Sequence, residues 1–187
     1  MLKTYISLLR GINISGHKLI RMDDLKVLCA ELGFSNIQTY IQSGNVVFQY
    51  EKVELKVLEK AMTEIIRQKY GFDVPVVVKE HEALKQIVAS NPFLSDTSKD
   101  VSKIYITFLS EPPDQQRYDQ MGEGQHFEED YRLYGDAMYI YCPNGYGNTK
   151  LSTNFLESKL KLAATSRNWK TTLQLLKMAD ALADLGK

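Results

Sequence analysis

The order in which apolar patterns follow one another is the feature that most constrains the fold of this chain. Apolar residues that alternate or form β-branched runs indicate strands, whereas apolar residues three and four positions apart indicate helices. Over the first eighty residues these patterns give a strand, a helix, two strands, a second helix and a fourth strand. The strands are expected at 4–11, 36–42, 45–50 and 74–80, and the helices at 22–32 and 54–70. This βαββαβ order predicts a sheet with helices packed on it.

The second half of the chain begins with an echo of the first. The strand pattern IYITFL (104–109) matches TYISLL (4–9) at its tyrosine, its second isoleucine and its last leucine. After it we expect a short helix at 112–121, strands at 129–134 and 136–142, and helices near 153–162 and 169–184. The order is βαββα, with a final helix where a last strand would complete the repeat.

These two halves together predict an α+β protein made of two ferredoxin-like units in tandem. The second unit is expected to be divergent and to carry an extra C-terminal helix. We expect the first unit at 1–80, a connecting helix and polar linker at 81–102, and the second unit at 103–187.

Composition favours a globular protein and disfavours one that coats nucleic acid. Of the 187 residues 44% are apolar and 25% charged, and 23 basic residues balance 23 acidic ones. Nucleic-acid-binding domains usually have a basic excess. The charge is unevenly spread, because residues 1–22 and 143–187 each carry +4 and residues 110–136 carry −6. The two basic segments would form one cationic face if the fold brought them together.

No pattern in the sequence predicts a metal, a cofactor or a reaction. Cys29 and Cys142 have no CxxC partner and no nearby histidine, so we expect two buried thiols in a reducing cytoplasm. His17, His81 and His126 stand far apart. No apolar run is long enough to span a membrane, so no membrane partner is expected. The sequence does not indicate the oligomeric state.

The stretch GINISGHKL (11–19) resembles a phosphate-binding P-loop and is not one. That motif needs a lysine directly after its last glycine and then a serine or threonine. Here His17 comes between Gly16 and Lys18, and Leu19 follows the lysine.

Topology gives the same stretch a different role. The first two strands of a split βαβ unit run parallel, so their C-terminal ends lie at the same end of the sheet. The loops that follow them, RGIN (10–13) and QSGN (42–45), are therefore expected to meet there. Glycines there would expose backbone N–H groups, and Arg10 would supply a cation. We predict a site for a carboxylate, a phosphate or a nucleotide edge. In the alternative interpretation Asn13 and Asn45 only cap turns, and Arg10 pairs with a nearby acid.

Three stretches of the chain also carry a family resemblance. LLRGIN, TYIQSGNVVF and the late motif ATSRNWKT (164–171) resemble the signatures of a bacterial family called domain of unknown function 1697. The resemblance implies two alpha-beta plait units and no established activity. The residues that it and the topology single out as ligand contacts are Arg10, Gly11, Asn13, Tyr40, Ser43, Gly44, Asn45, Arg167, Asn168 and Trp169.

The late motif has two interpretations. Thr165 or Ser166 would cap the last helix and Trp169 would pack inward, which leaves Arg167 and Asn168 unexplained. Placed against the loops of the first unit, these two would extend the cationic pocket. Three functions therefore stay open. The first is a protein that binds small anions or nucleotides, with or without an enzymatic activity. The second is a nucleic-acid-binding module, whose binding would weaken steeply with salt, and the third is a structural module without a ligand.

Overall fold

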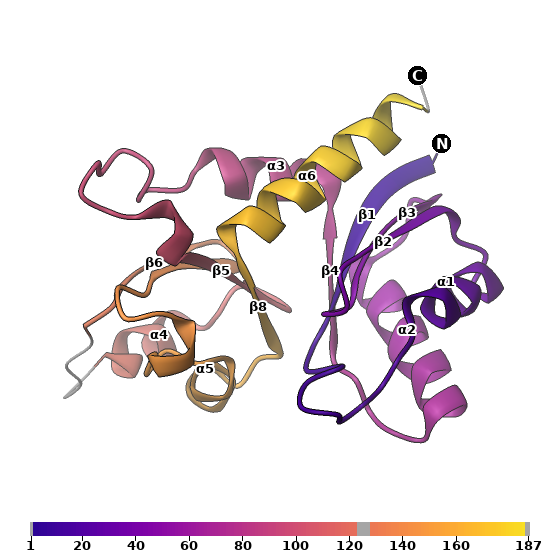
Figure 1. Cartoon of the computed structure of the whole chain (residues 1–187), viewed down its shortest axis with the longest axis horizontal. Coiled ribbons are helices and arrows are strands. Elements are labelled where there is room, and N and C mark those ends of the chain that lie inside the picture. The colour runs from indigo at the N-terminus through magenta and orange to yellow at the C-terminus, as the bar shows by residue number, and fades with distance from the viewer. Residues whose placement is uncertain (1, 123–127, 186–187) are drawn as a thin grey trace. The chain divides into compact units, whose positions relative to one another are not determined.

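The computed structural model describes residues 2–122 and 128–185, and in that part of the chain it has a mixed α+β fold (Figure 1). The described residues contain two four-stranded antiparallel sheets and six α-helices. The chain divides into two compact units, one made of residues 1–85 and 174–187 and the other of residues 86–173. Two helices, α3 (His81–Ala89) and α6 (Trp169–Asp184), contribute residues to both units.

The first sheet has its two longest strands at its centre. Its strand order is β2-β3-β1-β4, and all neighbours are antiparallel. Because β1 and β2 are both antiparallel to β3, they run parallel to each other, and their C-terminal ends lie at the same end of the sheet. The elements of this unit are β1 (Leu2–Leu9), α1 (Met22–Glu31), β2 (Ser35–Tyr40), β3 (Asn45–Glu51), α2 (Leu55–Tyr70) and β4 (Val76–Glu80).

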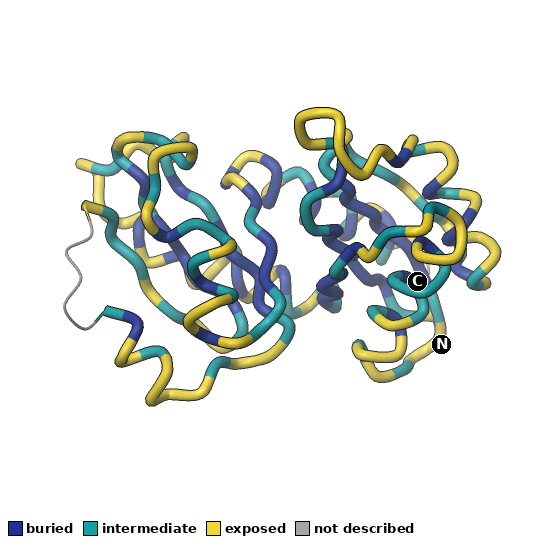
Figure 2. The backbone as a smooth tube through the Cα atoms, turned by 90° about the horizontal axis from the view of Figure 1, so that it is seen from below, coloured by how far each residue is buried: buried dark blue, intermediate teal, exposed yellow. Residues whose placement is uncertain are grey.

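Strand β1 is buried on both faces of the first sheet, so apolar residues occupy both its odd and its even positions. Tyr5 and Leu9 belong to the core beneath α1 and α2, and Ile6 and Leu8 are buried although they lie outside that core. The C-terminal part of α6 joins this unit, because the side chain of Gln49 donates a hydrogen bond of 3.0 Å to the Leu182 carbonyl. In Figure 2 dark blue, buried stretches of backbone run through the interior of each unit, and most of the outer turns are yellow and exposed.

The second sheet has the order β6-β7-β5-β8, again with antiparallel neighbours. Its core lies between the sheet and the helices α4 and α5. The elements of this unit beside α3 and α6 are η1 (Val101–Lys103), β5 (Ile104–Leu109), α4 (Gln115–Met121), β6 (Asp130–Tyr134), β7 (Ala137–Tyr141), η2 (Tyr146–Asn148), α5 (Thr153–Leu160) and β8 (Ala164–Asn168).

Strand β8 corrects the expectation that the second half lacks a last strand. It pairs with β5 along its whole length, from Leu109 opposite Ala164 to Tyr105 opposite Asn168. The cap of α6 also differs, because the side chain of Asn168, not of Thr165 or Ser166, accepts from the Thr171 N–H at 2.8 Å. The strand is short, polar and at the sheet edge, so it has no apolar alternation for the sequence to reveal.

The echo between the two halves extends to backbone hydrogen bonds. The Leu9 N–H donates to Gly44 O at 2.8 Å, and the Leu109 N–H donates to Asp136 O at 2.9 Å. In the next position Arg10 N–H donates to Pro75 O and Ser110 N–H donates to Ala163 O, each at 2.9 Å. Strands β1 and β5 therefore hold equivalent places in their sheets.

Candidate functional site

The loop after β1 and the turn between β2 and β3 contact each other, as the sequence predicted. We call residues 10–21 and 41–44 the loop pair. The Asn13 side chain donates to the Gln42 carbonyl at 2.7 Å, and the Leu9 N–H bonds Gly44 O. A Cβ at Gly44 would lie 2.7 Å from both Ile12 Cδ1 and Leu9 Cβ, so only glycine allows this close approach.

Two asparagine side chains hold the loop pair in shape. The Asn13 amide accepts from Ile20 N–H at 2.9 Å and donates to Ile20 O at 2.9 Å as well as to Gln42 O. The Asn45 amide is 0% exposed and donates to Tyr40 O at 2.8 Å and to Ser43 Oγ at 3.0 Å. Both side chains thus make the turn contacts of the alternative interpretation.

The backbone of the loop pair is unusually rich in left-handed conformations. Besides Gly11, Gly16 and Gly44, the non-glycine residues with positive φ are Asn13 (55°), Ser15 (50°), Lys18 (47°) and Ile41 (49°). Asparagine tolerates this region, but a β-branched residue such as Ile41 is an outlier there. Residues held in such conformations cluster at functional sites.

The loop pair is also basic. Residues 10–21 contain Arg10, His17, Lys18 and Arg21 and no acid. Arg10 is half-buried, and the Lys18 ammonium donates to the backbone carbonyl of Asp73. A Cβ placed on Gly11 would meet no atom within 4 Å, so its Cα borders open space. Cations beside an open, turned backbone suit an anionic group.

The other predicted site residues lie at the end of β2 and in the second unit. Tyr40 is the last residue of β2, while Arg167, Asn168 and Trp169 lie where β8 continues into α6. Arg167 is only 8% exposed and donates to Thr165 Oγ1 at 2.7 Å and to Ser166 O at 2.9 Å. Burial lowers the pKa of its guanidinium to about 10. That these residues contribute to one site with the loop pair stays a prediction.

A cluster of hydroxyl groups in the second unit was missed by the sequence analysis. The Ser166 Oγ lies 2.7 Å from Thr107 Oγ1, 2.7 Å from the Tyr146 hydroxyl and 3.1 Å from Thr153 Oγ1. The four residues come from four elements, so no local pattern signals the cluster. Its members satisfy one another and include no carboxylate, imidazole or amine to activate a hydroxyl. We assign it to holding β8 and η2 in place.

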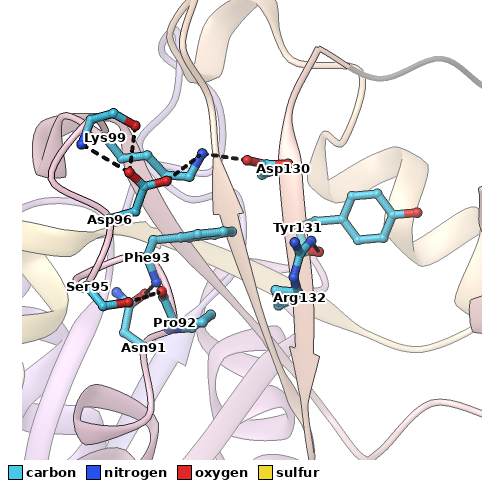
Figure 3. Close-up of polar contacts among 10 residues, drawn as sticks. Asn91, Pro92, Phe93, Ser95, Asp96, Lys99, Asp130, Tyr131 and Arg132 are labelled. Carbon is cyan, nitrogen blue, oxygen red and sulfur yellow. Dashed lines mark hydrogen bonds and ion pairs between the residues drawn. The ribbon is translucent and has the colours of Figure 1, made fainter.

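A second polar cluster anchors the linker after α3, as Figure 3 shows. The Lys99 ammonium bonds Asp130, lies 3.6 Å from Asp96 Oδ2 and sits 4.5 Å from the centroid of the Tyr141 ring. The hydrogen bond to Asp130 raises the pKa of Lys99. Since opposite charges are already paired here, the cluster fastens residues 91–100 to β6 and β7.

A cleft of about 230 Å³ in the second unit is lined partly by acids. Glu129 accepts from Lys150 N–H at 2.9 Å, and Glu128 accepts from the Asn144 amide. Burial raises the pKa of the Cys142 thiol, which also lines the cleft, to about 11. Among residues 2–122 and 128–185, no three His, Cys, Asp or Glu side chains are grouped to hold a metal ion. His126 lies outside the described residues.

The fold and the loop pair define a class of protein. It is a two-sheet α+β protein with basic, glycine-containing loops at one end of its first sheet. The chain belongs to the family described as protein of unknown function (DUF1697), whose model matches residues 2–139. That range includes the loop pair and excludes the motif at 164–171.

Comparison with solved structures supports the fold. A conserved bacterial protein from Streptococcus pneumoniae is similar with a TM-score of 0.76 at 20% identity, over 96% of this chain and 99% of that one. Among curated proteins none matches the sequence. In the described part of the chain, no helix is both long and apolar enough to cross a membrane.

Proposed function

We propose that this protein binds a small anionic ligand, such as a carboxylate, a phosphate or a nucleotide, at the loop pair of its first unit. The observation that carries the proposal is a comparison of the two units. Their central strands make equivalent backbone hydrogen bonds, yet Arg10 and Gly11 in the first unit correspond to Ser110 and Glu111 in the second.

The loop after the first strand and the turn between the next two strands are also longer in the first unit than in the second. Residues 10–21 join β1 to α1, whereas residues 110–114 join β5 to α4. Four residues, 41–44, connect Tyr40 to its partner Asn45, whereas Gly135 and Asp136 alone connect Tyr134 to Ala137. The second unit therefore builds the same kind of sheet without a basic loop or a strained turn. Features that the fold does not need are candidates for function.

We also propose the fold type of the two units and the location of the protein in the cell. We propose that both units are ferredoxin-like, with the boundary within residues 81–102; the strand orders β2-β3-β1-β4 and β6-β7-β5-β8 support this. A cytoplasmic location is supported by Cys29 and Cys142, which are both free and buried.

Calorimetric titration of the wild-type protein with inorganic phosphate, AMP and citrate tests the proposal. We expect saturable binding of at least one of them and a loss of about tenfold or more in affinity for Arg10→Ala, because one charge-assisted hydrogen bond is worth about 1.5–3 kcal/mol. Arg132→Ala is the matched control, since it removes an exposed guanidinium from β6.

Two results would contradict the proposal: no binding of any of the three anions to folded wild-type protein, or equal affinities for wild type and Arg10→Ala. Thermal unfolding of Arg10→Ala in the absence of ligand shows whether a loss of binding reflects a loss of folding. Binding of nucleic acid, with an affinity that declines steeply as the salt concentration rises, would instead favour a nucleic-acid backbone as the ligand.

A further inference from the structure

We infer that the ligand of the loop pair is an organic anion that carries an apolar group, free in solution, and that Ile41 contacts this group. The inference rests on the proposed function and names the class of ligand. It starts from three aliphatic side chains of the loop pair that stand in solvent: Ile14 is 61% exposed, Leu19 63% and Ile41 49%.

The segments that carry these side chains are fastened to one another. Asn13, the neighbour of Ile14, donates its amide to the carbonyl of Gln42, the neighbour of Ile41. Within the longer loop, Ile14 and His17 form an antiparallel bridge, and Asn13 N–H donates to Lys18 O at 3.2 Å. Ile14 and Leu19 thus belong to the two arms of one bridged loop, and the residue before Ile14 is hydrogen-bonded to the residue after Ile41.

Ile41 is poorly suited to its place if only the fold is considered. Its φ of 49° puts a β-branched side chain in the left-handed region, where asparagine or glycine would be accommodated at lower cost. Because half of the side chain is exposed, its burial returns little of that cost. An isoleucine that destabilises the turn and does not fill the core is consistent with a contact between its side chain and a ligand.

Charge and apolar surface together select the ligand class. An inorganic anion would use the cations of residues 10–21 but leave the three aliphatic side chains in water. A neutral apolar ligand would leave the cations unused. An organic phosphate or carboxylate satisfies both, since its charged end suits Arg10 and its apolar end covers Ile41.

The acids that border the loop pair favour a small ligand over a lipid surface. Asp23 and Asp24 occupy the first turn of α1, directly after the loop. A flat anionic bilayer would approach these carboxylates together with the cations, and like charges would repel. A small ligand needs to approach only the cations.

The probes for the test are inorganic phosphate and phenyl phosphate, titrated into the full-length protein at one pH and ionic strength. The two carry similar charge, so their difference reports the apolar group. We expect phenyl phosphate to bind about tenfold or more tightly than inorganic phosphate, as partial burial of a ring implies.

The variant that tests the assigned contact is Ile41→Asn. We expect it to raise the unfolding midpoint, because asparagine tolerates the left-handed region. We also expect it to weaken phenyl phosphate binding about fivefold or more and to leave inorganic phosphate binding unchanged. Val101→Asn is the matched control, because it removes a similarly exposed aliphatic side chain from η1 and is expected to leave both affinities as they are.

Each of the alternative results overturns a stated part of the inference. If both phosphates bind wild type equally and Arg10→Ala weakens both, the organic-anion inference is overturned and the proposed function stands. If neither phosphate binds, this inference is overturned, and binding of AMP or citrate then decides whether the proposed function stands. An unchanged phenyl phosphate affinity in Ile41→Asn overturns the assigned contact. Binding to phosphatidylglycerol vesicles without binding of phenyl phosphate overturns the inference in favour of a membrane surface.

Discussion

Lys79 and Arg167 occupy the same position in the two sheets. Lys79 is opposite Ile6 in the pairing of β4 with β1, and Arg167 is opposite Ile106 in the pairing of β8 with β5. Each is the penultimate residue of the last strand of its unit, and each strand continues directly into a helix. Both are buried, at 2% and 8% exposure. The duplicated architecture therefore includes a buried cation, which favours a structural role for Arg167.

Removing that arginine should destabilise the protein. Arg167→Ala takes away a buried side chain that bonds Thr165 Oγ1 and Ser166 O, so we expect a loss of about 2–4 kcal/mol in the free energy of unfolding. Urea unfolding measures it, and exposed Arg132→Ala should change the value by no more than about 0.5 kcal/mol. If Arg167→Ala keeps its stability but loses anion binding, Arg167 belongs to the ligand site instead.

The two glycines of the loop pair should respond differently to alanine. At Gly44 the added Cβ would meet Leu9 and Ile12 at 2.7 Å, in addition to the penalty for a φ of 77°. At Gly11, with a φ of 70°, it would meet nothing within 4 Å. We expect Gly11→Ala to cost about 1 kcal/mol and Gly44→Ala about 2–4 kcal/mol. Equal midpoints in urea unfolding would show that the close approach at Gly44 is not rigid.

Much of the fold was predictable because it depends on local periodicity and one topological rule. The β-rich run of residues 4–9 and the helical spacing of residues 55–66 predicted β1 and α2 directly. The contact of the two loops followed from the parallel course of β1 and β2. Strand β8 was not predictable, because Thr, Ser, Arg and Asn fill it and the surrounding sheet, not the sequence, makes them extended.

The details of the site depended on contacts that no local pattern encodes. Asn45 suggested a ligand contact, since its amide supplies a neutral donor and acceptor, but in the fold the amide is buried and donates to Tyr40 O and Ser43 Oγ. The left-handed Ile41 could not be expected, because isoleucine disfavours that conformation. The hydroxyl cluster around Ser166 joins residues up to 59 positions apart.

The side chain of Asn13 should be the most sensitive link between the two loops. Asn13→Asp keeps the oxygen that accepts from Ile20 N–H but loses both donors, to Ile20 O and Gln42 O. We expect a loss of about 1–3 kcal/mol in the free energy of unfolding, together with weaker anion binding, because the new carboxylate adds negative charge to the basic loop. Ser15→Asp, which adds the same charge at an exposed position of the loop, separates the two effects, since it should weaken binding with little loss of stability.

The two buried thiols should make the protein less stable at alkaline pH. Burial raises the pKa of Cys29 to about 12 and that of Cys142 to about 11, whereas unfolded cysteine has a pKa of about 8.5. Above about pH 8.5 the unfolded chain loses protons that the folded chain keeps. The free energy of unfolding should therefore fall as pH rises, by up to about 1.4 kcal/mol per pH unit for each thiol. Below that pH these thiols should have no effect.

Urea unfolding between pH 7.5 and 9.5 measures this slope, and the double variant Cys29→Ala with Cys142→Ala is the control. The difference in slope between wild type and the double variant isolates the thiols, since all other titrating groups are shared. Thiol labelling with a disulfide reagent at pH 8 gives a second measurement, because protonated, buried thiols should react only after unfolding. Equal slopes, or fast labelling of the native protein, would show that the two cysteines reach solvent more readily than their burial in the core allows.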